Sequence, residues 1–195
     1  GDRAASPRVS IIVFDTSTFV ARITLNHAPY NVLTVPMMKE LAEAIESLNG
    51  RIDVKCILMD SSQKMFSAGI SLEDSRPERV FQTLDAFNRV YLAVSEISKP
   101  LIVVVNGQAI GAGSELVAFG DMIIATPNAR FSQPEVKMGV FPPFAAIMLP
   151  QLIGPKKTYE LILTGQSLSA EEGLHLGLIN KVVPEAELGK TVNEV

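Results

Sequence analysis

The sequence predicts an α/β protein in which short buried strands alternate with helices. Apolar runs such as Leu101–Val105 are uniformly hydrophobic, as expected for parallel strands covered on both faces. Between these runs, apolar residues recur at helical spacing, and Gly and Pro are spread along the chain instead of forming tracts. In such a fold we expect the loops at the strand ends to hold the functional site.

The composition is that of a globular chain with a large core. Of the 195 residues, 47% are hydrophobic and 19% are charged, which favours one folded domain over residues 1–195 and argues against disorder. The 17 basic and 21 acidic residues give a net charge of −4, and no basic run could neutralise a row of phosphates. Apolar runs stop well short of the roughly 18 residues of a membrane span. We expect no nucleic-acid partner and no membrane span.

Two features predict a cytoplasmic location. Residues 1–7 contain no long apolar segment of the kind found in secretory signals. Cys56 is the only cysteine, which rules out an internal disulfide. Because Cys56 lies in the apolar run 54–59, we expect a buried strand thiol.

The first half of the chain contains signals for both strands and helices. Partly alternating β-branched residues predict an antiparallel hairpin over 9–14 and 19–25, and a short strand is expected at 54–59. Thr34 is a candidate helix cap for a surface helix over 35–48. A long helix is expected from Pro77, with residues at core spacing: Val80, Phe81, Leu84, Phe87, Tyr91, Val94 and Ile97.

The second half repeats the strand and helix alternation. The pattern predicts, in order, strand 101–105, a short helix opened by Gly111-Ala112-Gly113, strand 121–125, a helix from Pro155, a helix capped by Ser169, strand 178–183 and a helix from about Glu185.

Two glutamates in apolar or Gly-rich surroundings are candidates for acid/base work. Glu115 lies in the stretch 111–116 and Glu135 in the stretch 131–136. A partly desolvated carboxyl has a raised pKa, so a pair can divide into one ionised base and one protonated acid near neutral pH. The alternative is that each glutamate is a solvated helix or loop residue, since Glu is common near helix starts.

Two Gly-containing loops, 64–71 and 111–113, place small residues where backbone N–H groups can approach a ligand and stabilise an oxyanion. Tight turns that bind nothing use Gly in the same way. The stretch 111–116 fits neither the dinucleotide fingerprint nor a nucleophile elbow.

His27 and His175 are far apart and lack acidic neighbours at ligand spacing, so we expect no metal site.

Three segments, taken together, resemble a known family. They are Phe66-Ser67-Ala68-Gly69, the stretch 106–116 (NGQAIGAGSEL), and Ser132-Gln133-Pro134-Glu135. Their order, their gaps and their flanking strands are similar to those of the enoyl-CoA hydratase/isomerase (crotonase) superfamily, from about residue 9 to the end of the chain.

This resemblance implies a crotonase-like spiral of ββα units that binds an acyl-CoA thioester and assembles into homotrimers or hexamers. It places the oxyanion hole at the backbone N–H groups of Ala68 and Ala112, and adds Gly69, Ile70 and Gly111 to the substrate-binding residues. Coenzyme A enters only as part of the substrate, and no metal or redox cofactor is implied.

The resemblance also implies chemistry for the two glutamates. Hydratases of the family use two carboxylates, whereas isomerases and hydrolases often keep one, so Glu115 and Glu135 together favour an enoyl-CoA hydratase (a hydro-lyase). Glu115 would deprotonate the water and Glu135 would protonate the α-carbon. An enoyl-CoA isomerase and a non-catalytic CoA- or RNA-binding homologue remain the alternatives.

Three departures from the family pattern matter. The segment 139–146 (GVFPPFAA) is similar to that of enzymes hydrating cyclic dienoyl-CoA esters in anaerobic aromatic degradation, such as cyclohexa-1,5-dienecarbonyl-CoA hydratase, although Pro142 and Pro143 could equally just stiffen a loop. Ser71 stands where relatives commonly have Asp. The sequence ends at Val195, so we expect it to lack the usual C-terminal helices.

Overall fold

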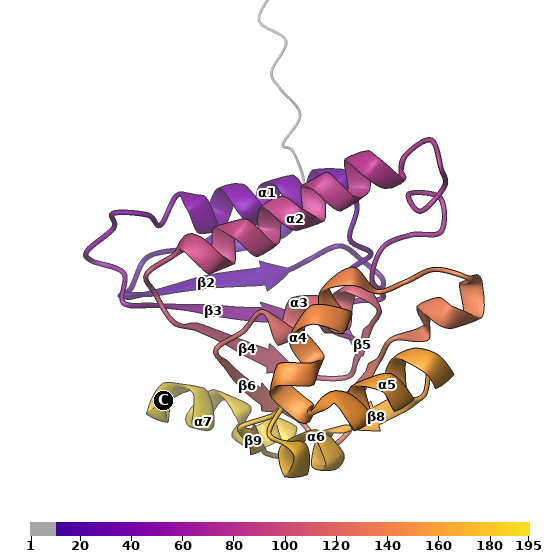
Figure 1. Cartoon of the computed structure of the whole chain (residues 1–195). Helices are drawn as coiled ribbons and strands as arrows, with labels where there is room; N and C mark the ends of the chain where they lie inside the picture. Colours follow the sequence, from indigo (N-terminus) through magenta and orange to yellow (C-terminus); the bar gives the residue numbers. More distant parts are fainter. Residues whose placement is uncertain (1–10) are drawn as a thin grey trace, which may run out of the picture.

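A computed structural model describes residues 11–195 (Figure 1). The strands are β1 (Ile12–Asp15), β2 (Val20–Leu25), β3 (Cys56–Ser61), β4 (Leu101–Val105), β5 (Gln108–Ile110), β6 (Met122–Ala125), β7 (Arg130–Ser132), β8 (Ser167–Ser169) and β9 (Lys181–Val182). The α-helices are α1 (Val35–Glu46), α2 (Val80–Glu96), α3 (Ala112–Ala118), α4 (Pro143–Ile153), α5 (Pro155–Thr164), α6 (Ala170–Leu176) and α7 (Leu188–Glu194), with 3₁₀ turns η1 (Pro134–Met138) and η2 (Glu185–Glu187).

The larger sheet has the strand order β1-β2-β3-β4-β6-β9. β1 and β2 pair antiparallel as the hairpin pattern predicted, and every other neighbour in this sheet is parallel. All five residues of β4 are buried, which explains its unbroken apolar sequence, because a central parallel strand is covered on both faces.

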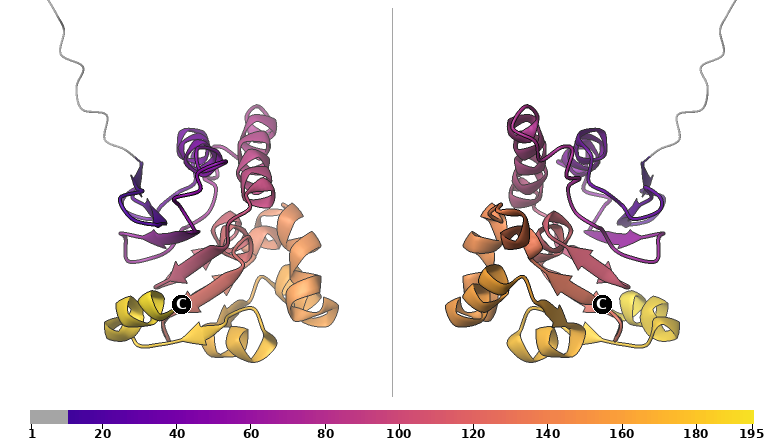
Figure 2. Two further views of the ribbon diagram at one scale, coloured as in Figure 1. Left: turned by 90° about the vertical axis from the view of Figure 1, so that its left-hand side faces the viewer. Right: turned by 90° about the vertical axis from the view of Figure 1, so that its right-hand side faces the viewer.

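Alternate residues of β4 serve two separate parts of the core. Leu101, Val103 and Val105 belong to the main cluster, which includes the buried faces of α1 and α2. Ile102 and Val104 point the other way, into a small cluster completed by α7. Figures 1 and 2 show α1 and α2 side by side along one face of the sheet, with α7 against the other. The period-two alternation of a strand therefore divides one apolar run between two layers.

A second sheet, which the sequence pattern did not predict, has the order β5-β7-β8. β5 and β7 are parallel, with Ala109 opposite Phe131, and β8 closes the sheet antiparallel. A parallel bridge from Ser67 to Ala109 adds the loop after β3 to its edge. Three chain segments thus run in the same direction and end at one edge.

The local start signals of two helices are confirmed. The Thr34 side chain accepts a hydrogen bond from the Met37 N–H at the start of α1. Ser169 forms a full capping box with Glu172 at the start of α6. Among the residues that the structure describes, none of the helices combines the length and the apolar character needed to cross a membrane.

Several predicted details are wrong. The last strand is only Lys181–Val182, because the preceding apolar residues pack as a buried turn after α6. Phe81 has core spacing on α2 but is 78% exposed. Cys56 begins β3 and is half-buried, not buried. The long helix begins at Val80 instead of Pro77. The first two residues of the predicted strand 9–14 lie outside the described range.

Candidate active site

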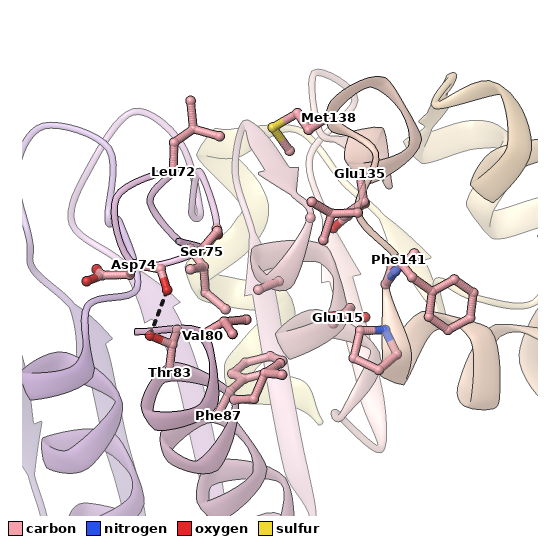
Figure 3. A pocket seen from close by; sticks show the side chains of 18 of the residues that line it. Leu72, Asp74, Ser75, Val80, Thr83, Phe87, Glu115, Glu135, Met138 and Phe141 are labelled. Atoms are coloured by element: carbon pink, nitrogen blue, oxygen red, sulfur yellow. Dashed lines mark hydrogen bonds between the residues drawn. The ribbon is translucent and has the colours of Figure 1, made fainter. Parts of the chain in front are cut away.

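The candidate site is a pocket of about 130 Å³ between α2, the loop after β3, α3, η1 and the start of α4. Its wall is mainly apolar, and the two candidate glutamates supply carboxyl groups to it. Figure 3 shows Glu115 and Glu135 on one side of this pocket, facing side chains of α2 and of the loop before it. Residues separated by up to 75 positions in sequence, from Ala68 to Pro143, meet here.

The second sheet explains why the two glutamates meet. β5 leads directly into α3, which carries Glu115, and β7 leads into η1, which carries Glu135. Because β5 and β7 are parallel and adjacent, their carboxyl ends lie at the same edge of the sheet. The Gly111 N–H donates to the Ser132 carbonyl (2.9 Å) and joins the two loops directly.

Glu115 is buried, with only 3% of its surface exposed. Its Oε1 accepts a hydrogen bond from the Ala145 N–H (2.8 Å) in the first turn of α4. Burial raises the pKa of Glu115 to about 7, and the nearby Glu135 adds to this rise, whereas the N–H groups of Ala145 and Phe144 oppose it. Glu115 can therefore gain or lose a proton near neutral pH.

Glu135 is half-buried on η1, and burial raises its pKa as well. Its Oε2 is a buried atom without a hydrogen-bond partner among the described residues. A carboxyl oxygen that receives no hydrogen bond favours the protonated form, because the charge would be uncompensated. The Glu135 backbone N–H opposes the rise in the pKa of its own carboxyl. The Ala145 and Phe144 N–H groups favour the ionised form of Glu115, whereas the unpartnered Oε2 favours the protonated form of Glu135.

Close backbone contacts hold the loops around the two carboxyls. A Cβ added at Gly69 would lie 2.6 Å from the Ile110 carbonyl oxygen and 3.2 Å from the Ala112 nitrogen. One added at Gly111 would lie 2.8 Å from Oε1 of Glu135. Both glycines also have positive φ values, +80° and +56°. The glycines that the sequence suggested for ligand approach thus also let the loops and Glu135 pack together.

The two predicted oxyanion donors differ in their hydrogen bonding. Ala112 is the first residue of α3, so its N–H has no acceptor within the helix. The Ala68 N–H, in contrast, donates to the carbonyl oxygen of Tyr30 (2.9 Å). Ala68, Gly69, Ile70 and Ala112 all line the pocket, as does Gly111. The predicted residues are brought together, but of the two predicted donors only the Ala112 N–H is without an acceptor among the described residues.

The sequence reasoning missed one wall of the pocket. Val80, Thr83, Leu84 and Phe87 of α2 line it. The helical spacing of Val80, Leu84 and Phe87 predicts core packing, and that spacing does not distinguish a pocket wall from a core; the polar Thr83 is outside the predicted pattern. Phe141, Pro142 and Pro143 also line the pocket. One interpretation of the sequence was that the two prolines only stiffen a loop.

The two histidines lie apart from this pocket. The His27 ring contacts the Val32 carbonyl oxygen through Nδ1 (2.8 Å), and His175 lies in the last turn of α6. Within residues 11–195, no group of three or more His, Cys, Asp or Glu side chains is arranged to hold a metal ion.

Comparison with known proteins identifies the family. Residues 15–195 match the model of the enoyl-CoA hydratase/isomerase family. A probable mitochondrial enoyl-CoA hydratase of Dictyostelium discoideum is 39% identical, over 87% of this chain and 62% of its own length. The short-chain-enoyl-CoA hydratase of Clostridium acetobutylicum is 33% identical, over 94% of this chain and 73% of that protein. The chain thus spans about two thirds of the length of these relatives.

Two further proteins are similar to this chain. Cyclohexa-1,5-dienecarbonyl-CoA hydratase of Thauera aromatica is 28% identical, over 85% of this chain and 64% of that protein. The crystal structure of an enoyl-CoA hydratase from Mycobacterium smegmatis superposes with a TM-score of 0.89 at 30% identity, over 94% of this chain and 74% of that chain. The mixed sheet, the strand-end pocket and these matches lead to one conclusion: the chain has the crotonase fold and belongs to the enoyl-CoA hydratase/isomerase family.

Proposed function

We propose that this protein adds water across the α,β double bond of an enoyl-CoA thioester. The observation that carries the proposal is the pair of carboxyl groups, Glu115 and Glu135, that reach one apolar pocket. Hydration needs a base for water and an acid for carbon, and two carboxyls with raised pKa values can share these tasks near neutral pH. The names of several similar proteins agree with hydration.

In the proposed reaction, the ionised Glu115 takes a proton from water as the water oxygen bonds to the β-carbon. The π electrons move toward the thioester, and the resulting enolate takes the proton of Glu135 at its α-carbon. The product is a β-hydroxyacyl-CoA, and one proton transfer from Glu115 to Glu135 restores the starting state. The Ala145 N–H supports the assignment of Glu115 as the base, because it stabilises the ionised form of Glu115.

We place the thioester oxygen at the N–H of Ala112, with the Ala68 N–H as the second donor. The bond from Ala68 to the Tyr30 carbonyl has to be shared or broken for this to occur. A preorganised N–H donor typically contributes about 10²–10³ in rate, so we assign this contribution to Ala112 and a smaller one to Ala68, whose N–H is already bonded to Tyr30. The cofactor requirement would be limited to the coenzyme A of the substrate.

A cyclic dienoyl-CoA ester is a second candidate substrate, besides a linear enoyl-CoA. The segment 139–146 favours it, because Phe141, Pro142 and Pro143 line the pocket, and the Thauera aromatica relative carries this substrate in its name. We further propose a cytoplasmic location, from the cysteine content and the N-terminal residues, and assembly into homotrimers or hexamers, as the family resemblance implies.

The test is hydration of crotonyl-CoA and of cyclohexa-1,5-dienecarbonyl-CoA, with the product identified by mass. Glu115→Gln and Glu135→Gln should each lower kcat by about 10²–10⁴-fold while the protein stays folded. Glu185→Gln, at an exposed glutamate of η2, is the matched control and should retain full activity. Double-bond migration without added water would instead identify an isomerase, and near-normal turnover of both pocket variants would refute the mechanism.

A further inference from the structure

The pocket has an open end and a closed end. At the open end, Leu72 is 70% exposed and Met138 is 50% exposed. At the other end, the side chain of Phe87 lines the pocket but is only 1% exposed. Figure 3 shows Phe87 beyond Val80 and Thr83 along α2, on the side of the pocket away from Leu72 and Met138. An acyl group that passes the two glutamates therefore reaches the Phe87 ring.

Phe87 is held in place from behind by other aromatic rings. Its ring centroid lies 5.1 Å from that of Phe144, in an edge-to-face arrangement at 89°, and 5.4 Å from that of Phe119. Tyr91 contacts both Phe119 and Phe144 at 5.2 Å and closes the cluster. A ring packed at these distances cannot rotate away without opening a void or displacing its neighbours. Phe87 is thus a fixed wall.

The size of the pocket gives the limit that this wall imposes. Its volume is about 130 Å³. An apolar protein cavity of about 150 Å³ holds one benzene molecule. The pocket is slightly smaller than that cavity, so its size matches a short acyl chain, or at most one six-membered ring that extends toward the open end, and it is too small for an extended chain of roughly ten carbons.

We propose that Phe87 sets the upper size of the acyl group, so that the site accepts short or single-ring acyl thioesters and rejects long linear ones. This inference rests on the proposed function for the identity of the ligand class. The test measures binding of saturated acyl-CoA thioesters, which cannot be hydrated. The size limit can therefore be measured even if the protein does not catalyse hydration.

The experiment measures the Kd of butanoyl-, cyclohexanecarbonyl- and decanoyl-CoA by calorimetry. In an unobstructed apolar pocket, each added methylene should tighten binding about fourfold. We expect the reverse for the unaltered protein, with decanoyl-CoA bound at least about tenfold more weakly than the ring ester. Phe87→Ala should abolish or invert this preference. Phe81→Ala is the matched control, because Phe81 lies on the same helix but is exposed and outside the pocket.

A second variant covers the case in which Phe87→Ala does not fold. Val80→Phe adds volume within the pocket and should weaken binding of the ring ester at least about tenfold while sparing butanoyl-CoA. The proposal is overturned if the unaltered protein binds decanoyl-CoA more tightly than the ring ester. In that case the chain would leave between Leu84 and Phe141, which are 37% and 65% exposed. An unchanged ring affinity in Val80→Phe would also overturn it.

Discussion

Replacing Gly111 by alanine tests how far the position of Glu135 controls the reaction. Gly111 has φ +56° and ψ −124°, a conformation that L-residues rarely adopt. The new Cβ would lie 2.8 Å from Oε1 of Glu135, where ordinary contacts begin at 3.4 Å. The carboxyl would therefore have to move by at least about 0.6 Å, unless the backbone moves instead.

The two consequences have different magnitudes and different readouts. Backbone strain should lower the free energy of unfolding by about 1–3 kcal/mol. Displacement of a reacting group by about 1 Å can cost about 10²-fold in rate, so we expect kcat to fall by about 10- to 100-fold. Stability is measured by urea denaturation and kcat by hydration of a saturating enoyl-CoA at a temperature where the variant is fully folded.

Gly50→Ala is the control for backbone strain. Gly50 also has a positive φ, +75°, but apart from its own residue and its two chain neighbours, no atom of the described residues lies within 4 Å of its added Cβ. It should lose a similar amount of stability and no activity. The reasoning is refuted if folded Gly111→Ala keeps full kcat, or if Gly50→Ala loses kcat to the same extent.

Two further predictions concern stability. The pKa of Glu115 rises from 4.5 to about 7 on folding, so the folded state binds the proton more tightly and loses up to about 3 kcal/mol of stability as the pH rises through this window. Glu115→Gln should therefore be more stable than the unaltered protein at pH 8 and about equal to it at pH 4, as measured by urea denaturation; an equal difference at both pH values would contradict this. Ser169→Ala removes the capping box of α6 and should cost about 1 kcal/mol without lowering kcat; unchanged stability would show that the cap contributes nothing.

Local sequence signals predicted local structure well. The Thr34 and Ser169 caps act at the starts of α1 and α6, and the hairpin of β1 and β2 forms as expected. These features depend on residues a few positions apart, so they are visible in a short window of sequence. Exposure was less predictable: the apolar recurrence along the helix places both Phe81 and Phe87 in the core, yet Phe81 is exposed and Phe87 lines the pocket.

The sequence by itself determined which residues could do chemistry: two glutamates in apolar surroundings and two loops of small residues. Only the tertiary structure decided that they meet. Parallel pairing of β5 and β7 places Glu115 and Glu135 at one sheet edge, and the second sheet that does this consists of three-residue strands too short to leave a periodic signal. The Tyr30 carbonyl bound to Ala68, and the aromatic cluster behind Phe87, likewise depend on contacts between distant segments, which no local pattern contains.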